Sequence, residues 1–185
     1  ELPQIERRDY VFNANDSHWV PHATARLEGY SPLTGSERSS LSLRSRMNAT
    51  VLGDLSASGP SGSDGRFTRN ELARAILSNR GLTEELLRKQ LVARCEDHST
   101  VTVGLDSVNL VGACQVLAAW SGRVDLESRG AVLWRETMGQ FGRAALRQAG
   151  PLFAEPFDES NPIETPRGLA SGNGVLVRLG QAVRL

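Results

Sequence analysis

The sequence has almost no lysine, little cysteine and no long apolar run. Lys89 is the only lysine among 21 basic residues, so arginine carries nearly all of the positive charge. The 21 acidic residues balance it, and a formal net charge of zero offers no basic field for nucleic acid. No apolar run is long enough for a membrane span, and no signal-peptide pattern opens the chain. We therefore expect neither a nucleic-acid partner nor a membrane partner.

Motifs of several enzyme classes are also missing. The sequence has no Gly-x-Ser-x-Gly elbow, no Walker loop and no dinucleotide-binding fingerprint. A zinc site from His18 and His22 would need both on one helix face, and Pro21 between them disfavours that helix. Asp64 and Glu71 match half of a calcium loop, but proline and glycine stand where its first carboxylates belong. We expect no metal and no cofactor.

Four segments follow one another along the chain. Its 185 residues, of which 39% are hydrophobic, suffice for one globular domain with a core. Residues 1–50 predict a strand and then a loop, and residues 51–67, rich in glycine and serine, predict a flexible connector. Residues 68–150 predict a helical segment. Residues 151–185 contain four prolines and predict a loop followed by a helix that is cut short.

Helical periodicity is the clearest signal in the helical segment. Thr68 and Glu71 form a Thr-x-x-Glu capping box that opens a helix, and Thr83 caps a second one. Apolar residues recur with helical spacing after Asp106 or Ser107, where we expect a third helix. The expected elements are helices over 68–78, 83–95, 106–118 and 131–148, a final helix over 175–183, and a short β piece over 100–103.

A cluster of polar residues follows the first β-prone stretch. Tyr10-Val11-Phe12 favours a strand, and the chain then becomes polar at Asn13, Asn15, Asp16 and Ser17. Reactive side chains often occupy such strand ends, because the scaffold holds them in place. The alternative is an Asx-turn, in which these side chains bond only the neighbouring backbone. The residues alone leave both interpretations open.

Several short motifs, taken in order, resemble one enzyme family. They are Asn-Ala-Asn-Asp-Ser at 13–17, Leu-Glu-Gly-Tyr-Ser-Pro at 27–32, Gly-Ser-Glu-Arg at 35–38, Ser-Leu-Arg-Ser-Arg at 42–46, Asp-Gly-Arg-Phe-Thr at 64–68, Cys-Gln-Val-Leu-Ala-Ala-Trp at 114–120 and Ser-Arg-Gly-Ala at 128–131. The set resembles the β-subunit of penicillin-acylase-type N-terminal-nucleophile hydrolases. The branch it is most similar to removes fatty acyl chains from homoserine lactones or from lipopeptides such as aculeacin. The resemblance implies a mainly α fragment, with about four to five helices and one or two strands, of an αββα hydrolase.

The resemblance also implies roles for individual residues. In that family an asparagine of this segment donates its side-chain amide to the oxyanion of the tetrahedral intermediate. That role falls to Asn15 here, with Asn13 as the second choice. An amide held in place stabilises developing charge without reorganising. A family arginine that holds the catalytic groups corresponds to Arg38 or to Arg44, and an ordinary surface position is the alternative for each.

The family resemblance implies a larger protein around this segment. The chain begins Glu1-Leu2-Pro3, without the Ser, Thr or Cys that such enzymes use as nucleophile. We therefore expect an internal segment, inactive alone, whose partners are the remainder of its own α and β subunits and an N-acyl small-molecule substrate. Uncovered helix faces would let the isolated segment self-associate. The alternatives are a β-lactam side-chain acylase and a non-catalytic helical interaction module.

The two cysteines, Cys95 and Cys114, fall near the ends of adjacent predicted helices. The resemblance implies a periplasmic or secreted enzyme, and disulfides persist in those compartments. We therefore expect a bridge between Cys95 and Cys114. Two free buried cysteines are the alternative.

Overall fold

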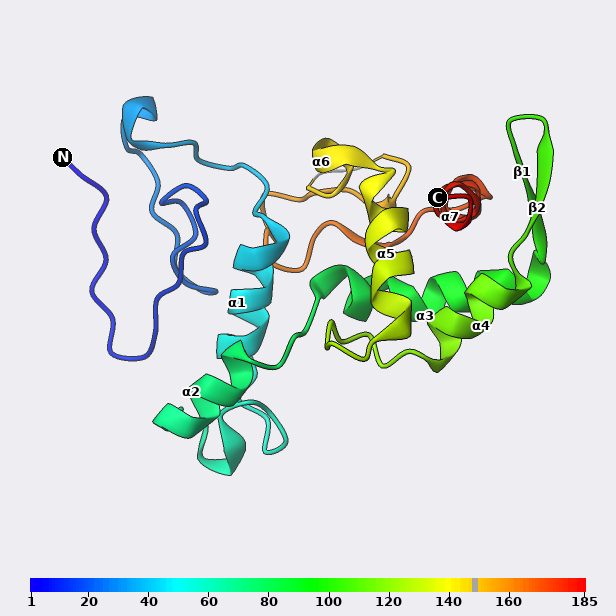
Figure 1. Cartoon of the computed structure of the whole chain (residues 1–185). Coiled ribbons are helices and arrows are strands. Elements are labelled where there is room, and N and C mark those ends of the chain that lie inside the picture. The colour runs from blue at the N-terminus through cyan, green and yellow to red at the C-terminus, as the bar shows by residue number, and fades with distance from the viewer. Residues whose placement is uncertain (148–149) are drawn as a thin grey trace. The chain divides into compact units, whose positions relative to one another are not determined.

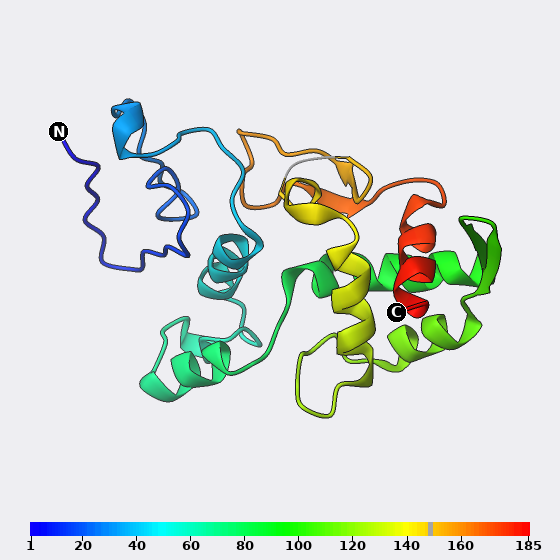
Figure 2. The same cartoon turned by 45° about the horizontal axis from the view of Figure 1, so that its top comes forward.

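The chain forms two compact units (Figures 1 and 2). The computed structural model describes residues 1–147 and 150–185. The first unit contains Glu1–Ser78 and Asp158–Glu164, and the second contains Asn79–Phe157 and Thr165–Leu185. The first unit is largely irregular with two α-helices, the second is mainly helical, and the described residues together hold seven α-helices and two small two-stranded sheets. The chain is thus mainly α, as the sequence predicts, although with more helices and strands than expected.

The first unit begins with a long irregular segment and not with the predicted strand. Tyr10-Val11-Phe12 is extended but unpaired, apart from one bond in which the Phe12 N–H donates to the Pro21 carbonyl at 2.9 Å. Pro21 has no N–H, so it cannot return the bond that would start a ladder. The strand prediction is therefore wrong, because β propensity does not form a strand where the neighbouring segment, at Pro21, has no N–H to donate in return. The only regular element before residue 43 is a 3₁₀ turn, η1 (Pro32–Thr34).

Helix α1 (Leu43–Gly53) lies where the sequence predicts a loop and the start of a connector. Its N-cap is Ser42, whose hydroxyl accepts a hydrogen bond from the Ser45 N–H at 3.2 Å. The residues that it buries are Ser45, Arg46 and Ala49. Because two of these are polar and the third is small, the helix shows no apolar stripe, and hydrophobic periodicity could not reveal it.

Helix α2 (Arg69–Ile76) confirms the predicted capping box. The Thr68 hydroxyl accepts from the Glu71 N–H at 3.3 Å, and the Glu71 carboxylate accepts from the Thr68 N–H at 2.8 Å. A 3₁₀ turn, η2 (Gly62–Asp64), precedes it in the glycine- and serine-rich stretch. The helix ends two residues earlier than expected.

Helices and two small hairpins build the second unit around one apolar core. The helices are α3 (Leu82–Asp97), α4 (Val111–Ala119), α5 (Arg129–Gly139), α6 (Gly142–Ala145) and α7 (Gly174–Val183). The sheets are β1 (Thr100–Val103) with β2 (Asp106–Asn109), and β3 (Phe153–Glu155) with β4 (Arg167–Leu169), both antiparallel. The side chains with no exposed surface in this core include Leu87, Leu91, Leu110, Leu117, Leu152, Leu176 and Leu179. Within the described residues, no helix combines the length and apolar character that crossing a bilayer needs.

Two predicted helix starts in the second unit are wrong. Thr83 does not cap α3, which starts after Gly81; instead its buried hydroxyl accepts from Trp134 Nε1 at 3.0 Å. Asp106 and Ser107 belong to β2 and not to a helix, because Gly104, with a φ of 66°, turns the chain back onto β1. Helix α4 therefore starts at Val111.

The expected helix over 131–148 is broken into α5 and α6 at residues 140–141. Gly142, with a φ of 72°, supplies the conformation that the break requires. The predicted end at Gln148 lies outside the described residues. The expected loop over 151–168 contains β3 and the start of β4, which are only three residues each. Four prolines limit that region to such short elements.

Candidate functional site

The asparagine cluster of the first unit forms a tight turn that engages both ends of the Asn13 carboxamide. Asn13 Oδ1 accepts from the Asn15 N–H at 2.7 Å, and Asn13 Nδ2 donates to the Asp16 carbonyl at 3.1 Å. This is the Asx-turn that the sequence left open. It places Asn15 in the left-handed region, with a φ of 66°, which asparagine tolerates better than most residues. The side chain of Asn13 therefore serves the turn.

Asn15 has a different set of contacts, because Arg44 reaches it from the first turn of α1. Arg44 Nη2 donates to the Ala14 carbonyl at 3.0 Å and to Asn15 Oδ1 at 3.1 Å. A guanidinium only donates, so the Asn15 atom that faces it must be the carboxamide oxygen. The Asn15 NH₂ group makes no hydrogen bond within the described residues, and the side chain is exposed. The arrangement leaves a neutral, oriented N–H donor at the surface.

A second contact ties the turn to α1. Asp16 Oδ2 accepts from the N–H of Ser42, the N-cap residue of α1, at 2.7 Å. Asp16 therefore anchors the helix that carries Arg44 to the turn that carries Asn15. The sequence places Asp16 in the motif but does not identify this role.

Arg38, the other candidate arginine, does not join this pair. It has a φ of 50° and its exposed guanidinium lies 3.4 Å from the Glu28 carboxylate. Glu28 also accepts from Trp19 Nε1 at 2.9 Å, which lowers the pKa of Glu28 more than Arg38 does. The structure thus brings Arg44, and not Arg38, onto Asn15.

Glu37 holds the neighbouring loop through backbone groups. Its carboxylate accepts from the Gly29 N–H at 3.0 Å and the Tyr30 N–H at 2.8 Å, and His18 Nε2 lies 3.4 Å away. The Gly29 and Tyr30 N–H groups lower the pKa of Glu37 below its ordinary value. Sequence reasoning identifies Glu37 only as part of a motif, because its partners are backbone groups that no pattern marks.

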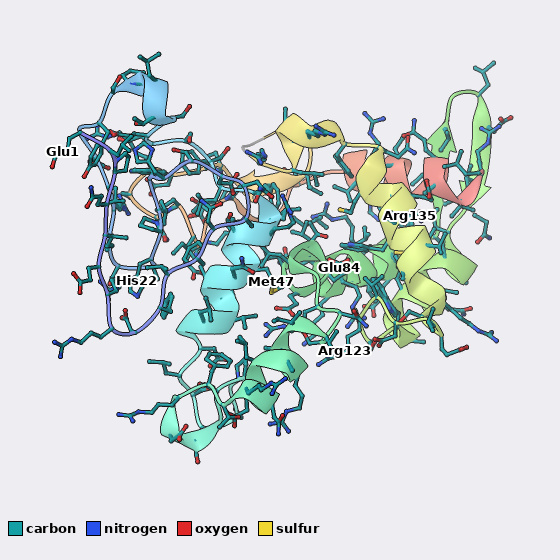
Figure 3. The ribbon with its side chains drawn as sticks, turned by 60° about the vertical axis from the view of Figure 1, so that its left-hand side comes forward. Glu1, His22, Met47, Glu84, Arg123 and Arg135 are labelled. Carbon is teal, nitrogen blue, oxygen red and sulfur yellow. A yellow bond between two sulfur atoms is a disulfide. The ribbon has the colours of Figure 1, made fainter. Side chains whose placement is uncertain are left out.

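The two histidines considered for zinc have separate partners. His22, labelled in Figure 3, is buried. Its Nε2 lies 3.2 Å from Asp9 Oδ2, and its Nδ1 accepts from the Thr24 N–H at 3.0 Å. His18 lies beside Glu37 instead. Across residues 1–147 and 150–185, no group of three or more His, Cys, Asp or Glu side chains could hold a metal ion.

Arg46 is a buried arginine that the sequence does not single out. Its Nε donates to the Ile163 carbonyl at 2.6 Å, and only 1% of its surface is exposed. Burial lowers the pKa of Arg46 to about 10, against a smaller raising effect of Glu164. Its Nη1 has no hydrogen-bond partner in the described part of the chain. The contact fixes residues 158–164 onto α1.

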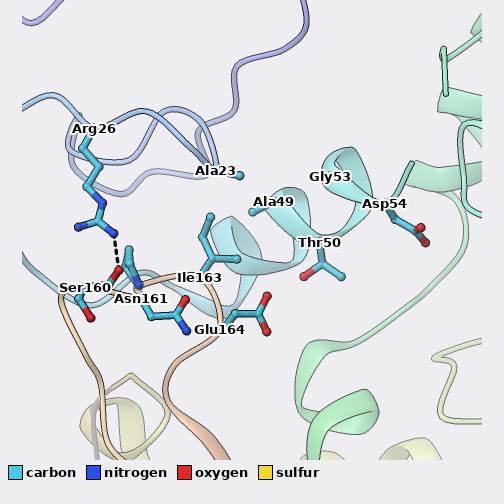
Figure 4. A pocket seen from close by; sticks show the side chains of 11 residues that line it. Ala23, Arg26, Ala49, Thr50, Gly53, Asp54, Ser160, Asn161, Ile163 and Glu164 are labelled. Carbon is cyan, nitrogen blue, oxygen red and sulfur yellow. Dashed lines mark hydrogen bonds between the residues drawn. The ribbon is translucent and has the colours of Figure 1, made fainter. Parts of the chain in front are cut away.

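A pocket of about 410 Å³ opens beside the C-terminal half of α1 (Figure 4). Arg26 closes one side, since its Nη1 and Nη2 donate to the Glu159 and Ser160 carbonyls at 2.9 and 2.6 Å. The lining residues are Ala23, Arg26, Ala49, Thr50, Gly53, Asp54, Ser160, Asn161, Pro162, Ile163 and Glu164. Neither Asn15 nor Arg44 lines it, so this pocket and the asparagine turn are different places on the first unit.

In the second unit, the sulfur atoms of Cys95 and Cys114 are joined in a disulfide. It connects the last turn of α3 to the first turn of α4, and their Cα atoms are 6.0 Å apart. The strands β1 and β2 lie in the loop that the bridge closes.

Comparison with known proteins places this mainly helical chain in one family. The family model described as penicillin amidase matches residues 1–181, so the chain belongs to the penicillin amidase family. It is 37% identical over 167 residues to aculeacin-A acylase from Actinoplanes utahensis, which covers 89% of this chain and 20% of that protein. It is 31% identical over 172 residues to the acyl-homoserine lactone acylase PvdQ from Pseudomonas savastanoi pv. phaseolicola, covering 92% of this chain and 20% of that protein.

A third relative extends the match almost to the whole chain. The acyl-homoserine lactone acylase PvdQ from Pseudomonas putida is 29% identical over 178 residues, covering 96% of this chain and 20% of that protein. The chain thus spans about a fifth of the length of the curated relatives that it matches.

Proposed function

We propose that this chain is part of an acylase that hydrolyses N-acyl amide bonds, and that Asn15 is one donor of its oxyanion hole. Membership of the penicillin amidase family supports the reaction class. The observation that carries the role of Asn15 is the hydrogen bond between its Oδ1 and Arg44 Nη2, at 3.1 Å. This bond turns the carboxamide so that its NH₂ group is the part left to bind another molecule.

The reaction requires a nucleophile that lies outside these residues. In the proposed mechanism, the hydroxyl of an N-terminal serine attacks the amide carbonyl carbon while the α-amine of that serine takes its proton. The carbonyl oxygen then becomes negative, and Asn15 Nδ2 donates a hydrogen bond to it. When the C–N bond breaks, the amine leaves with the transferred proton, and water later hydrolyses the acyl ester. A fixed neutral donor favours the negative oxygen over the neutral carbonyl, which lowers the barrier.

Arg44 is proposed as a positioning residue. Its guanidinium also bonds the Ala14 carbonyl, so it holds both the backbone and the side chain of the turn. Asp16 supports this arrangement by fixing the start of α1. Arg38 pairs with Glu28 and is not given this role.

The substrate is proposed to be a small molecule with a long aliphatic acyl chain on an amide nitrogen. The names of the relatives, aculeacin-A acylase and acyl-homoserine lactone acylase, support this class. The remainder of the α and β subunits, arranged as the αββα sandwich, is proposed to supply the nucleophile and the walls of the acyl pocket. A periplasmic or secreted location is proposed as well, and the disulfide in the second unit supports it.

The test replaces Asn15 in the longer protein and measures hydrolysis of a fatty-acyl homoserine lactone. Asn15→Ala should lower kcat by about 10²–10³-fold, or about 3–4 kcal/mol of barrier, with a smaller change in KM. Asn13→Ala, two residues away, is a matched variant that tests the turn alone. Unchanged turnover in Asn15→Ala would show that Asn15 is not an oxyanion-hole donor. Faster hydrolysis of a benzyl or glutaryl β-lactam amide than of the fatty-acyl homoserine lactone would assign the β-lactam amides as the substrate class instead.

A further inference from the structure

Helix α2 (Arg69–Ile76) presents its apolar side chains to solvent. None of its residues is buried, and Leu72 and Ile76 are 42% and 72% exposed. Leu77, directly after the helix, is 75% exposed. The least exposed residues of the helix, Glu71 and Ala75, include the carboxylate that caps its own start. An ordinary surface helix turns its apolar stripe inward, whereas the large apolar side chains of α2 face solvent together with its polar ones.

The exposed apolar face of α2 also has a hollow in it. A shallow hollow of about 520 Å³ lies on it, lined by Asn70, Ala73, Arg74 and Leu77. Ala73 and Leu77 are four residues apart, so their side chains share one stripe along the helix. A small side chain beside a large one gives a place where an apolar side chain of another segment can insert.

Physical chemistry argues against this helix as an isolated surface element. A helix of eight residues is unstable in water unless tertiary contacts support it, because nucleation is costly. The capping box supports only its first turn. Single exposed apolar side chains are ordinary, whereas contiguous ones, such as Leu72, Ile76 and Leu77 here, are typical of interaction sites.

We propose that this face of α2 is a docking surface for a segment of the longer acylase outside these 185 residues. This inference rests on the proposed function, since it takes the chain to be one part of that acylase. The chain spans only about a fifth of the length of its relatives, so ample polypeptide exists to cover the face. The occupant inserts an apolar side chain between Ala73 and Leu77 and packs on Leu72 and Ile76.

Charged side chains surround the apolar face of α2, and this rim indicates which charges the occupant carries. Arg69 lies at the start of the apolar stripe, four residues before Ala73, and Arg74 lies beside the stripe with a largely exposed guanidinium, 4.0 Å from Glu71. Two arginines, Arg69 and Arg74, stand against one carboxylate, Glu71, so the rim has a net positive charge. The occupant therefore carries carboxylates beside its apolar residues, a combination that would pair with these arginines.

The first experiment compares amide hydrogen exchange of residues 69–77 in the longer protein and in the 185-residue chain. Docking predicts exchange at least about tenfold slower in the longer protein, because the covered helix must open before it exchanges. Equal exchange in the two proteins would overturn the proposal. This readout is independent of turnover, so it distinguishes a failed docking surface from a failed assignment of Asn15.

The second experiment places a charge on the face. Ile76→Glu in the longer protein should lower its thermal midpoint and abolish the protection of residues 69–77. The matched control is Leu126→Glu, at a fully exposed leucine in the loop before α5. An equal fall in the midpoint for both variants would overturn the assignment to α2.

Two further outcomes would assign the face to a different occupant and so overturn the proposal. One is that the longer protein forms dimers that Ile76→Glu dissociates, which would make the occupant a second copy. The other is that the longer protein binds phosphatidylserine vesicles and loses this binding in Arg69→Gln/Arg74→Gln. The expected result is a longer protein whose association state and lack of vesicle binding are the same in all variants.

Discussion

Arg44 Nη2 donates a hydrogen bond to Asn15 Oδ1 across 29 positions of sequence, at 3.1 Å. Because Arg44 occupies Oδ1, the NH₂ group is the end of the Asn15 carboxamide that is left to donate a hydrogen bond to another molecule. In the proposed function, Arg44 acts without touching substrate, since its guanidinium bonds both Asn15 Oδ1 and the Ala14 carbonyl.

In the longer acylase, Arg44→Ala should lower kcat by about tenfold to a hundredfold, because Asn15 would lose the partner that orients it. Arg38→Ala is the control, since Arg38 pairs with exposed Glu28 and not with Asn15, and its kcat should stay near that of the wild type. Arg44→Lys should restore part of the rate. In the double variant with Asn15→Ala the losses should not add, because both act through one donor. Additive losses would show that Arg44 acts elsewhere.

The disulfide between Cys95 and Cys114 closes a loop with a sequence separation of 19. Cys114→Ser should lower the free energy of unfolding by about 3 kcal/mol, because an open loop gives the unfolded chain more freedom. Urea denaturation checks this value. Dithiothreitol should lower the free energy of unfolding of the wild type by the same amount and leave that of Cys95→Ser/Cys114→Ser unchanged. Two reactive thiols in oxidised, denatured protein would contradict the bridge.

Two glycines of α5 offer a matched test of packing. A Cβ on Gly130 would lie 2.6 Å from Trp120 Cγ, whereas a Cβ on Gly139 would meet nothing within 4 Å. Gly130→Ala should therefore cost about 1–3 kcal/mol of stability through overpacking. Gly139→Ala should be neutral or stabilise by up to about 1 kcal/mol, because alanine favours the helix. Thermal unfolding of the two variants, measured side by side, decides the prediction, and equal midpoints would contradict it.

Glu37 should make stability sensitive to acid. Its pKa is lower in the folded chain than its ordinary value of 4.5, first because of the Gly29 N–H and then because of the Tyr30 N–H. A carboxylate of this kind stabilises the fold above the unfolded pKa, and the stabilisation is lost as pH falls through the folded pKa. The free energy of unfolding should therefore decline with acidification below pH about 4.5, and Glu37→Gln should make that decline shallower.

The control for this acid effect is Glu6→Gln, in the same unit. Glu6 is exposed and makes no hydrogen bond in the part of the chain that the structure describes. Denaturant unfolding at a series of pH values should give Glu6→Gln the wild-type slope. The same slope for Glu37→Gln would show that the backbone contacts of Glu37 do not contribute to the fold.

Local secondary structure was predictable from the sequence wherever residues close in the chain determine it. The capping box of Thr68 and Glu71 needs only residues three apart, and it forms as expected. The apolar periodicity after residue 110 gives α4 for the same reason. Helix α1 could not be found this way, since it buries Ser45 and Arg46 in place of an apolar stripe.

By itself, the sequence determined the mainly helical character of the chain and the family whose motifs it carries. Only the tertiary structure decided which of two arginines meets Asn15, and that Asn13 closes a turn. It also decided that residues 106–109 pair as a strand instead of starting a helix. The physical reason is range: capping and periodicity act within a few residues, whereas orienting Asn15 requires a guanidinium that only folding brings near.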